Sequence, residues 1–275
     1  MKIPQQILSK ILLFKEICYK KACYSSSKRR VEELEKITRD LRFENDILRN
    51  EQQDLRATTS KRWIMGSGIE IGPLHKPLYY RKENATVKYV DRLGEKELRQ
   101  QYPELKDLEI TTPDYIDDGE VLNSQENNSL DFIIANHMIE HCKNPIKTIQ
   151  NHLEKLKLGG ILYYTIPNKE FTFDKKRKLT TIKHLVDDYY EKNNHDRHFF
   201  ECVKDSEGYT DPKQIKTRVK KLMDMNYSIH CHVWNKHSLI EFFLFLTTFE
   251  QLKDRFEMEL VVSNGEEIIV ILRKL

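Results

Sequence analysis

Residues 68 to 78, "GIEIGPLHKPL", begin like the first strand and turn of a cofactor-binding α/β sheet. Glu70 and Gly72 follow a short apolar stretch, and the missing side chain of Gly72 lets backbone amides approach a ligand closely. Pro73 and Pro77 stand where a phosphate-binding helix would begin, and they disfavour an uninterrupted helix there. The turn therefore predicts a ligand that lacks a pyrophosphate.

Strand and helix patterns alternate around this turn, which predicts a parallel sheet with helical crossovers. The expected strands cover residues 69–71, 87–91, 108–110, 131–135 and 161–166, and the expected helices cover 95–102, 144–157 (closed by Gly159 and Gly160) and 236–249. In the final stretch Asn264 and Gly265 lie between two β-rich runs, which predicts an antiparallel hairpin. Residues 167–230 show helical patterns without strands, and insertions of this kind form lids or substrate surfaces.

The N-terminal residues 1–24 have the pattern of a basic amphipathic helix. Over residues 1–30 there are eight Lys or Arg and one Glu, and isoleucines recur at helical spacing. This charge favours peripheral contact with an anionic membrane surface, and packing on a protein partner is the alternative. The apolar runs are too short for a membrane-spanning helix, and no secretory cleavage pattern is present.

Residues 28–60 have the pattern of a short coiled coil. Leucines recur every seven residues, at Leu34, Leu41, Leu48 and Leu55. Asn45 occupies a central a position, which favours two strands, so we expect a homodimer through this segment. A single helix packed on the main domain, residues 63–275, is the alternative.

Charge and cysteine content restrict the possible partners and compartment. The formal net charge is +3, small against 46 basic and 43 acidic side chains, so no nucleic-acid partner is expected for the whole chain. The five cysteines form no C-x-x-C pair, which argues for reduced thiols rather than disulfides or a cysteine zinc site. We therefore expect a cytoplasmic protein, with the inner face of the membrane as a further location.

Polar residues follow the successive predicted strands, where an open α/β sheet binds its ligands. Asp91 ends the second strand, at the distance from the first that suits hydrogen bonds to ribose hydroxyls. Asp114 and Tyr115 follow the predicted third strand and could meet an adenine, and Asn136 and His137 follow the fourth. A nucleoside without phosphates, bearing an amino acid, fits these groups: S-adenosyl-L-methionine.

Five motifs together resemble the class I S-adenosylmethionine-dependent methyltransferases: "GIEIGP", "VKYVDR", "PDYIDDGE", "LDFIIANHMIEH" and "LEKLKLGGILYYTIPN". The chain is most similar to the small-molecule branch that is often encoded with bacterial glycosyltransferases of surface-polysaccharide synthesis. The resemblance implies an α/β fold, a Rossmann-like sheet with a terminal antiparallel hairpin. It further implies cofactor contacts from Glu70 and Gly72 at the amino-acid end, from Asp91 at the ribose, from Asp114 and Tyr115 at the adenine, and from Arg92 and Asn136.

Methyl transfer to a sugar or glycan hydroxyl is the expected reaction, and a hydroxyl needs a nearby base at neutral pH. His137 follows the fourth strand directly and is the first candidate, with a hydrogen bond at the rim of the site as its alternative role. His141 lies four residues further, where a helical turn brings it near the same face. It is a second catalytic candidate, and positioning of the loop is its alternative role.

The insertion and the segment after it supply the candidate substrate residues. Polar Asp174, Arg177 and His198 could form a substrate wall beside aromatic residues, or an ordinary lid. His230 and His232 share one face of an extended segment, and Trp234 continues that face, which suits a sugar-stacking platform or half of a metal site. No third ligand is evident in the sequence, so no metal is predicted.

Two other functions compete with the enzyme hypothesis. One is a non-catalytic coiled-coil scaffold with a methyltransferase-like domain, which the sparse glycines of the first turn favour. The other is a nicotinamide-dependent oxidoreductase, which the shortened glycine loop and the terminal hairpin disfavour. Converging polar residues at the strand ends favour the methyltransferase.

Overall fold

The computed structural model describes residues 55–192 and 196–275. Residues 56–275 form one compact unit, which begins upstream of Trp63. The predicted amphipathic helix at 1–24 and residues 28–54 of the predicted coiled coil lie outside the described residues, so both stay predictions. Within the described part, no helix has both the length and the apolar character needed to cross a membrane.

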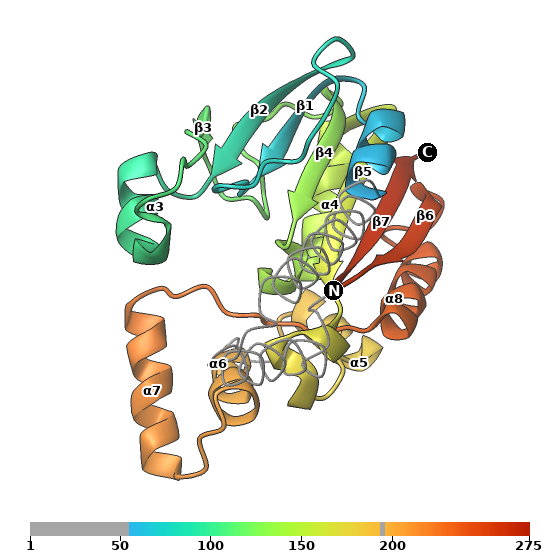
Figure 1. The fold of residues 1–275 in the computed structure, drawn as a ribbon. Helices are drawn as coiled ribbons and strands as arrows, with labels where there is room; N and C mark the ends of the chain where they lie inside the picture. Colours follow the sequence, from blue (N-terminus) through green and yellow to red (C-terminus); the bar gives the residue numbers. More distant parts are fainter. Residues whose placement is uncertain (1–54, 193–195) are drawn as a thin grey trace, which may run out of the picture. The chain divides into compact units, whose positions relative to one another are not determined.

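A seven-stranded sheet organises the described chain, in the order β3-β2-β1-β4-β5-β7-β6 (Figure 1). The first five strands run parallel, and β7 is antiparallel to both of its neighbours. The predicted α/β fold with a terminal hairpin is confirmed. The strands are β1 (Gly66–Ile71), β2 (Ala85–Asp91), β3 (Tyr115–Ile116), β4 (Leu130–Asn136), β5 (Leu156–Pro167), β6 (Phe256–Asn264) and β7 (Glu267–Lys274).

The strand order reverses between β1 and β4. From β1 the chain adds β2 and β3 on one side, and it then returns to add β4 and β5 on the other. Such a switch point opens a crevice at the carboxyl ends of the central strands, where α/β proteins bind ligands. Residues 72–84, which join β1 to β2, form turns without a helix, as the prolines predicted.

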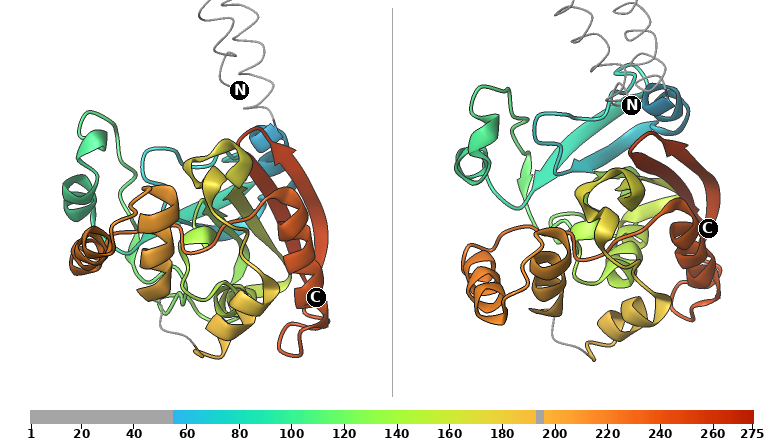
Figure 2. Two further views of the ribbon diagram at one scale, coloured as in Figure 1. Left: turned by 90° about the horizontal axis from the view of Figure 1, so that it is seen from below. Right: turned by 60° about the horizontal axis from the view of Figure 1, so that its bottom comes forward.

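The helices cover the sheet and its carboxyl edge. They are α3 (Glu95–Gln101), α4 (Pro145–Lys155), α5 (Ile182–Tyr189), α6 (Asp196–Glu201), α7 (Pro212–Asp224) and α8 (Lys236–Thr248). The N-cap Asn144 starts α4, and a capping box of Asn235 and Ser238 starts α8. Both views of Figure 2 place α8 beside the β6–β7 hairpin.

The two faces of the sheet are packed differently. On one face, buried residues of α4 and α8 join the strands in a single apolar cluster that includes Ile149, Phe242 and Ile133. The other face carries Tyr163, whose hydroxyl lies 2.8 Å from Thr59 Oγ1 on the helical residues 56–63. That short helix therefore crosses β5 and reaches the carboxyl edge with its first residues.

The third strand was predicted in the wrong place. Residues 108–110 form no strand, and β3 is instead Tyr115–Ile116. Leu108 is exposed, whereas Ile110 is buried in a side cluster with Leu98 of α3. Apolar residues at 108 and 110 have the two-residue spacing of a strand, but here the spacing reflects this local packing. The pattern alone cannot distinguish the two cases.

The glycine pair after α4 also differs from its prediction. The helix ends at Lys155, β5 begins at Leu156, and Gly159 and Gly160 lie inside that strand. The β4–β5 register shifts between Leu130 and Phe132, and Gly159 has φ +77°. The glycines thus form a bulge in β5 rather than the cap of a helix.

The predicted insertion after β5 is helical. Its described residues between 168 and 230 contain α5, α6 and α7 and no strand. These helices lie beyond the ends to which the arrowheads of β1, β2 and β4 point (Figure 1). The insertion therefore covers the edge of the sheet at which the candidate ligand residues end.

Candidate functional site

The turn after β1 is held down by a buried carboxylate. Glu70 is fully buried, and its two oxygens accept the Leu78 amide hydrogen at 2.9 and 3.1 Å. Asn136 Nδ2 donates to Glu70 Oε1 at 3.2 Å, and burial raises the pKa of Glu70 to about 7. Glu70 thus anchors the turn, and a direct contact with the amino-acid end of the cofactor stays a prediction.

Gly72 leaves room for a ligand beside the turn. Its φ is +61°, and no heavy atom lies within 4 Å of the position that a Cβ would take. Asp91, at the end of the neighbouring strand β2, is 7% exposed, and Oδ1 accepts a long hydrogen bond of 3.4 Å from the Leu93 amide. An open backbone approach next to a nearly buried carboxylate fits the ribose and amino-acid ends of S-adenosyl-L-methionine.

Arg92 connects this edge to the insertion. Its Nη1 donates to the Asn226 carbonyl, just beyond α7, at 3.3 Å. The buried Nη2 has no hydrogen-bond partner among the described residues. The side chain thus keeps one donor available beside Asp91, which is compatible with its predicted place near the cofactor.

The predicted adenine contacts of Asp114 and Tyr115 stay a prediction, although the strand from which they were assigned lies elsewhere. Asp114 precedes β3, and its carboxylate accepts the Tyr89 amide hydrogen at 2.8 Å, alongside the middle of β2. The Tyr115 ring lies beside Lys88, whose Nζ is 5.3 Å from the ring centroid. Both residues were assigned from the misplaced third strand, and neither follows a strand end.

The loop at 117–119 occupies the position that the sequence analysis assigned to Asp114. The Asp117 amide donates to the Asp91 carbonyl at 3.0 Å. A Cβ on Gly119 would come within 2.7 Å of Ile71 and 3.1 Å of Met138, so the loop packs against the strand ends. The signal was present as "DDG" directly after "YI", but the third strand was predicted too early in the chain, at 108–110.

A chain of hydrogen bonds crosses the carboxyl edge from β1 to β7. Thr165 Oγ1 donates to Asn136 Oδ1 at 3.0 Å, and Arg56 Nη2 donates to Thr165 Oγ1 at 3.1 Å. Arg56 Nε then donates to Glu267 Oε1 at 2.6 Å. Sequence reasoning missed Arg56 and Glu267, because neither follows a parallel strand and their proximity to His137 arises only on folding.

His137 is the last residue in this series of hydrogen bonds. Its ring Nε2 lies 2.8 Å from Glu267 Oε2, and 44% of its side chain is exposed. The residue adopts φ +51°, a left-handed conformation that the bond from its amide to the Thr165 carbonyl helps to hold. The imidazole therefore leaves the end of β4 partly exposed and in contact with the first residue of β7.

The charge of Glu267 determines which nitrogen of His137 carries the hydrogen. Burial acts to raise the pKa of Glu267, but hydrogen bonds from His137 and Arg56 lower it to about 2. An ionised carboxylate only accepts hydrogen bonds, so Nε2 donates, and in the neutral form of the ring Nδ1 then carries the lone pair. Nδ1 faces the buried Glu140, whose Oε1 is 3.8 Å away.

His141 occupies a positioning site. Its Nδ1 lies 2.9 Å from the Ile229 carbonyl, and the same nitrogen lies 3.0 Å from Ser228 Oγ. Burial lowers the pKa of His141 to about 3, so the ring is neutral at physiological pH. The contact ties the segment at 228–234 to the loop after β4, in line with the alternative role considered for this residue.

The predicted polar substrate wall is a buried brace. Arg177 Nη1 lies 3.1 Å from Asp174 Oδ1, and both side chains are almost fully buried. The same Nη1 donates to the His230 carbonyl at 2.7 Å, and His230 Nδ1 lies 2.5 Å from Asp174 Oδ2. These groups satisfy one another and leave no polar surface for an acceptor.

His198, His232 and Trp234 are also buried, so they form no sugar-stacking surface. The Trp234 ring stacks on Phe242 in the core, with centroids 5.8 Å apart. Their apolar neighbours draw the extended segment inward, whereas sequence alternation alone does not show which face meets solvent. Phe171 and Phe173, which follow β5, have exposed aromatic side chains.

A surface hollow lies at the opposite edge of the sheet. It is lined by Arg62, Trp63, Asp131 and Gly159, among others, at the amino ends of β1, β4 and β5. None of the polar residues from the strand ends reaches it. The candidate site therefore remains the carboxyl edge.

Residues 65–243 match the model of the family described as "Methyltransferase domain". The match covers well over half of the chain. The chain belongs to this methyltransferase family. The expected cofactor is that of the methyltransferase domain, S-adenosyl-L-methionine. No curated protein matches the chain.

Several solved structures resemble the methyltransferase at low sequence identity. A SAM-dependent methyltransferase from Aquifex aeolicus is 12% identical, with coverage of 81% of this chain and 89% of that chain and a TM-score of 0.44. A possible histamine N-methyltransferase from Thermotoga maritima is 14% identical, with coverage of 76% and 82% and a TM-score of 0.39. The CurJ carbon methyltransferase is 14% identical, with coverage of 77% of this chain and a TM-score of 0.38, and the present chain spans 49% of its length.

Proposed function

We propose that this methyltransferase methylates a hydroxyl of a sugar or glycan, with His137 as the general base. The observation that carries the proposal is the pair of His137 and Glu267 at the carboxyl end of β4, with Nε2 and Oε2 2.8 Å apart. Bound S-adenosyl-L-methionine supplies a methyl group already activated by its sulfonium. The protein then has to align the acceptor and take its proton.

The tautomer of His137 suits this task. With Nε2 donating to ionised Glu267, Nδ1 of the neutral ring carries the lone pair that can accept the proton of an acceptor hydroxyl. The negative charge of Glu267 stabilises the imidazolium that forms. Arg56 holds Glu267 from the other side, through Nε at 2.6 Å, and so keeps the carboxylate in place.

A carbohydrate acceptor fits the exposed aromatic side chains beside this edge. Phe171 and Phe173 are 61% and 65% exposed, and the Phe173 ring centroid lies 4.8 Å from that of His230. Aromatic faces beside hydrogen-bonding groups suit sugar rings. We extend the proposal to surface-polysaccharide synthesis in the cytoplasm or at the inner face of the membrane. The expected dimer and membrane contact would bring the enzyme to lipid-linked glycans.

Cofactor binding and methyl transfer are tested in two steps. Calorimetric titration with S-adenosylhomocysteine should show binding to the wild type, and the absence of binding would favour a scaffold. Transfer of a labelled methyl group is then measured to sugar nucleotides, free sugars and lipid-linked glycans. His137→Gln should retain cofactor binding and lose about 10²- to 10⁴-fold in kcat. Transfer only to amine or carbon acceptors, or full activity of His137→Gln, would contradict the proposal.

A further inference from the structure

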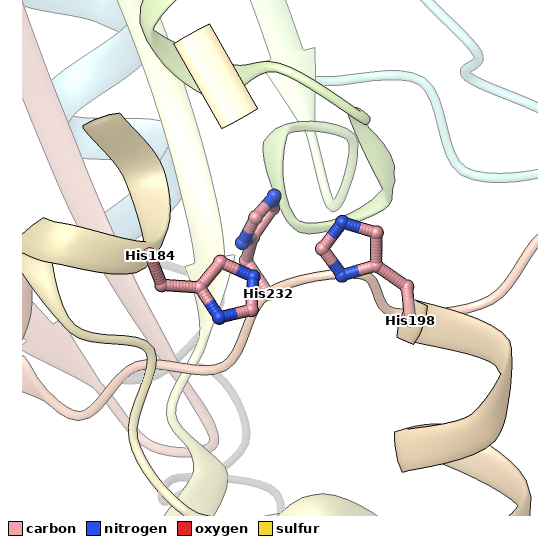
Figure 3. Close-up of side chains that lie close together, drawn as sticks. All are labelled: His184, His198 and His232. Carbon is pink, nitrogen blue, oxygen red and sulfur yellow. The ribbon is translucent and has the colours of Figure 1, made fainter. Parts of the chain in front are cut away.

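Three histidines come together where two helices of the insertion meet the segment that follows it. His184 lies on α5, His198 on α6, and His232 on the extended segment after α7 (Figure 3). Their ring centroids are 5.0 to 5.3 Å apart, so the rings form a nearly regular triangle. One ligand nitrogen from each ring lies within 4.8 Å of the others.

A buried carboxylate faces all three rings. Asp188 lies one helical turn after His184 and is completely buried. The distances from its Oδ2 are 3.2 Å to Nε2 of His184, 3.6 Å to Nε2 of His198 and 3.8 Å to Nε2 of His232. Among the described residues this oxygen accepts no hydrogen bond, which is costly for a buried carboxylate.

We propose that His184, His198, His232 and Asp188 bind a zinc ion. Zinc takes imidazole nitrogen and carboxylate oxygen at about 2.0 to 2.2 Å, so neighbouring ligand atoms of a tetrahedron lie roughly 3.3 to 3.6 Å apart. The three distances from Asp188 Oδ2 fall around that separation. Two of them are too long for hydrogen bonds, so hydrogen bonds to Asp188 Oδ2 do not explain why all three rings face it.

The surroundings supply what a metal site requires beyond its ligands. Arg197 Nη2 pairs with Asp188 Oδ1 and also donates to the His184 carbonyl at 3.3 Å, which fixes the carboxylate with Oδ2 toward the rings.

Four protein ligands leave no open coordination position, so the site is structural rather than catalytic. Zinc there would join α5, α6 and the segment at 229–234. That segment is held to the loop after β4, because the amides of Cys231 and His232 both donate to the Glu140 carbonyl, at 2.7 and 3.0 Å. The metal would thus clamp the insertion onto the candidate active site beside His137.

A second cluster provides the main alternative location. Glu140, His141 and His230 also offer ligand atoms within 4.8 Å of one another. His141 Nδ1 already contacts the Ile229 carbonyl, and His230 Nδ1 contacts Asp174. These bonds occupy one nitrogen of each ring, and three ligands converge there among the residues that the structure describes, so the cluster around Asp188, with four, is the stronger site.

Metal analysis of the purified full-length protein tests the proposal. After dialysis against zinc, the wild type should hold one zinc ion per chain and show a higher thermal midpoint than the chelated protein. His184→Gln and His198→Gln should lose the ion. His237→Gln is the matched control, because His237 is an exposed histidine with 85% of its side chain accessible, and it should retain the ion. Loss of zinc in His230→Gln with retention in His184→Gln would place the metal in the second cluster and overturn the proposal.

Spectroscopy of the wild type keeps the test decisive if a variant fails to fold. Zinc X-ray absorption should show four nitrogen or oxygen ligands with imidazole outer shells, and Co²⁺ should give the intense visible bands of a tetrahedral site. A sulfur ligand, an octahedral Co²⁺ spectrum, or no retained metal after dialysis would overturn it. S-adenosylhomocysteine binding and methyl transfer are measured separately, so failure of the zinc site does not depend on the proposed function.

Discussion

His137 and Glu267 are 130 residues apart in the sequence, yet His137 Nε2 lies 2.8 Å from Glu267 Oε2. The contact joins the end of a parallel strand to the start of the antiparallel strand β7. It exists because β7 is inserted next to β5 and brings its first residue to the carboxyl edge. The terminal hairpin therefore contributes a charged group to the candidate active site.

The charge of Glu267 should matter for turnover more than for cofactor binding. Glu267→Gln removes the charge that stabilises protonated His137, so we expect kcat to fall by about 10-fold or more with an unchanged affinity for S-adenosylhomocysteine. Glu266→Gln is the control, since Glu266 is the exposed neighbour. The measurements are steady-state methyl transfer and calorimetry. Equal turnover of the two variants would remove Glu267 from the mechanism.

Asp91 and Asp114 should differ in their effect on cofactor affinity. Asp91→Ala removes the carboxylate at the end of β2, and a hydrogen bond to a charged group is worth about 1.5 to 3 kcal/mol. We therefore expect S-adenosylhomocysteine to bind roughly 10- to 100-fold more weakly. Asp114→Ala loses only the hydrogen bond to the Tyr89 amide and should keep the affinity of the wild type. The reverse ranking in a titration would restore the original adenine assignment of Asp114.

Gly72 and Gly159 provide a matched pair of glycines for testing whether the backbone at Gly72 approaches the cofactor. Both have positive φ, +61° and +77°, and neither has an atom within 4 Å of its hypothetical Cβ. Alanine at either position should therefore cost a similar backbone strain of about 1 kcal/mol in stability. Only Gly72→Ala should weaken cofactor binding, because Gly159 lies in the bulge of β5 at the opposite edge. Denaturant titration measures the change in stability, and calorimetry measures the cofactor affinity. Equal affinities of the two variants would contradict a cofactor contact at Gly72.

The stability of the protein should depend on the ionisation of Glu70. Burial raises its pKa in the folded protein from 4.5 to about 7, so the folded state binds a proton more tightly than the unfolded state. The resulting stabilisation is fully present below about pH 4.5 and is lost as the pH rises through about 7. Glu70→Gln should lack this dependence, whereas Glu83→Gln, at an exposed position, should keep it.

Denaturant unfolding at about pH 5 and about pH 8 measures the difference, which we expect to reach about 2 to 3 kcal/mol. Other carboxylates titrate in the same range, so the comparison is between variants at each pH rather than between pH values. A constant offset between wild type and Glu70→Gln at both pH values would contradict the shifted pKa.

The strand ends were predictable because their signals are local. An apolar run followed by an acid or an amide identifies β1, β2 and β4, and parallel strands bring their carboxyl ends to one edge whatever their order. The third strand failed because β3 has only two residues, too few for a periodic pattern. Because that strand was predicted too early in the chain, Asp114 was predicted to lie beside Asp91. In the structure the loop at 117–119 lies there.

The buried residues of the insertion could not be assigned from the sequence. His198 and His232 are residue types that are common on binding surfaces. No feature of the neighbouring sequence shows that both rings are buried. His184 and Asp188 carry no distinctive sequence signal, because a histidine and an aspartate one helical turn apart are common on solvated helices. Only the packing of α5 and α6 against the segment at 229–234 brings the four groups together.

The sequence by itself determined the order of strands and helices, the hairpin at the end, and the acids and glycine that suit S-adenosyl-L-methionine. These follow from periodicity and turn chemistry, which act over a few neighbouring residues. Only the tertiary structure decided which side chains make contact. It places Glu267, held by Arg56, against His137, pairs Asp174 with Arg177, and arranges three histidines around Asp188. The reason is physical: side-chain contacts depend on strand register and helix packing, and these are set by burial of the whole core rather than by any one segment.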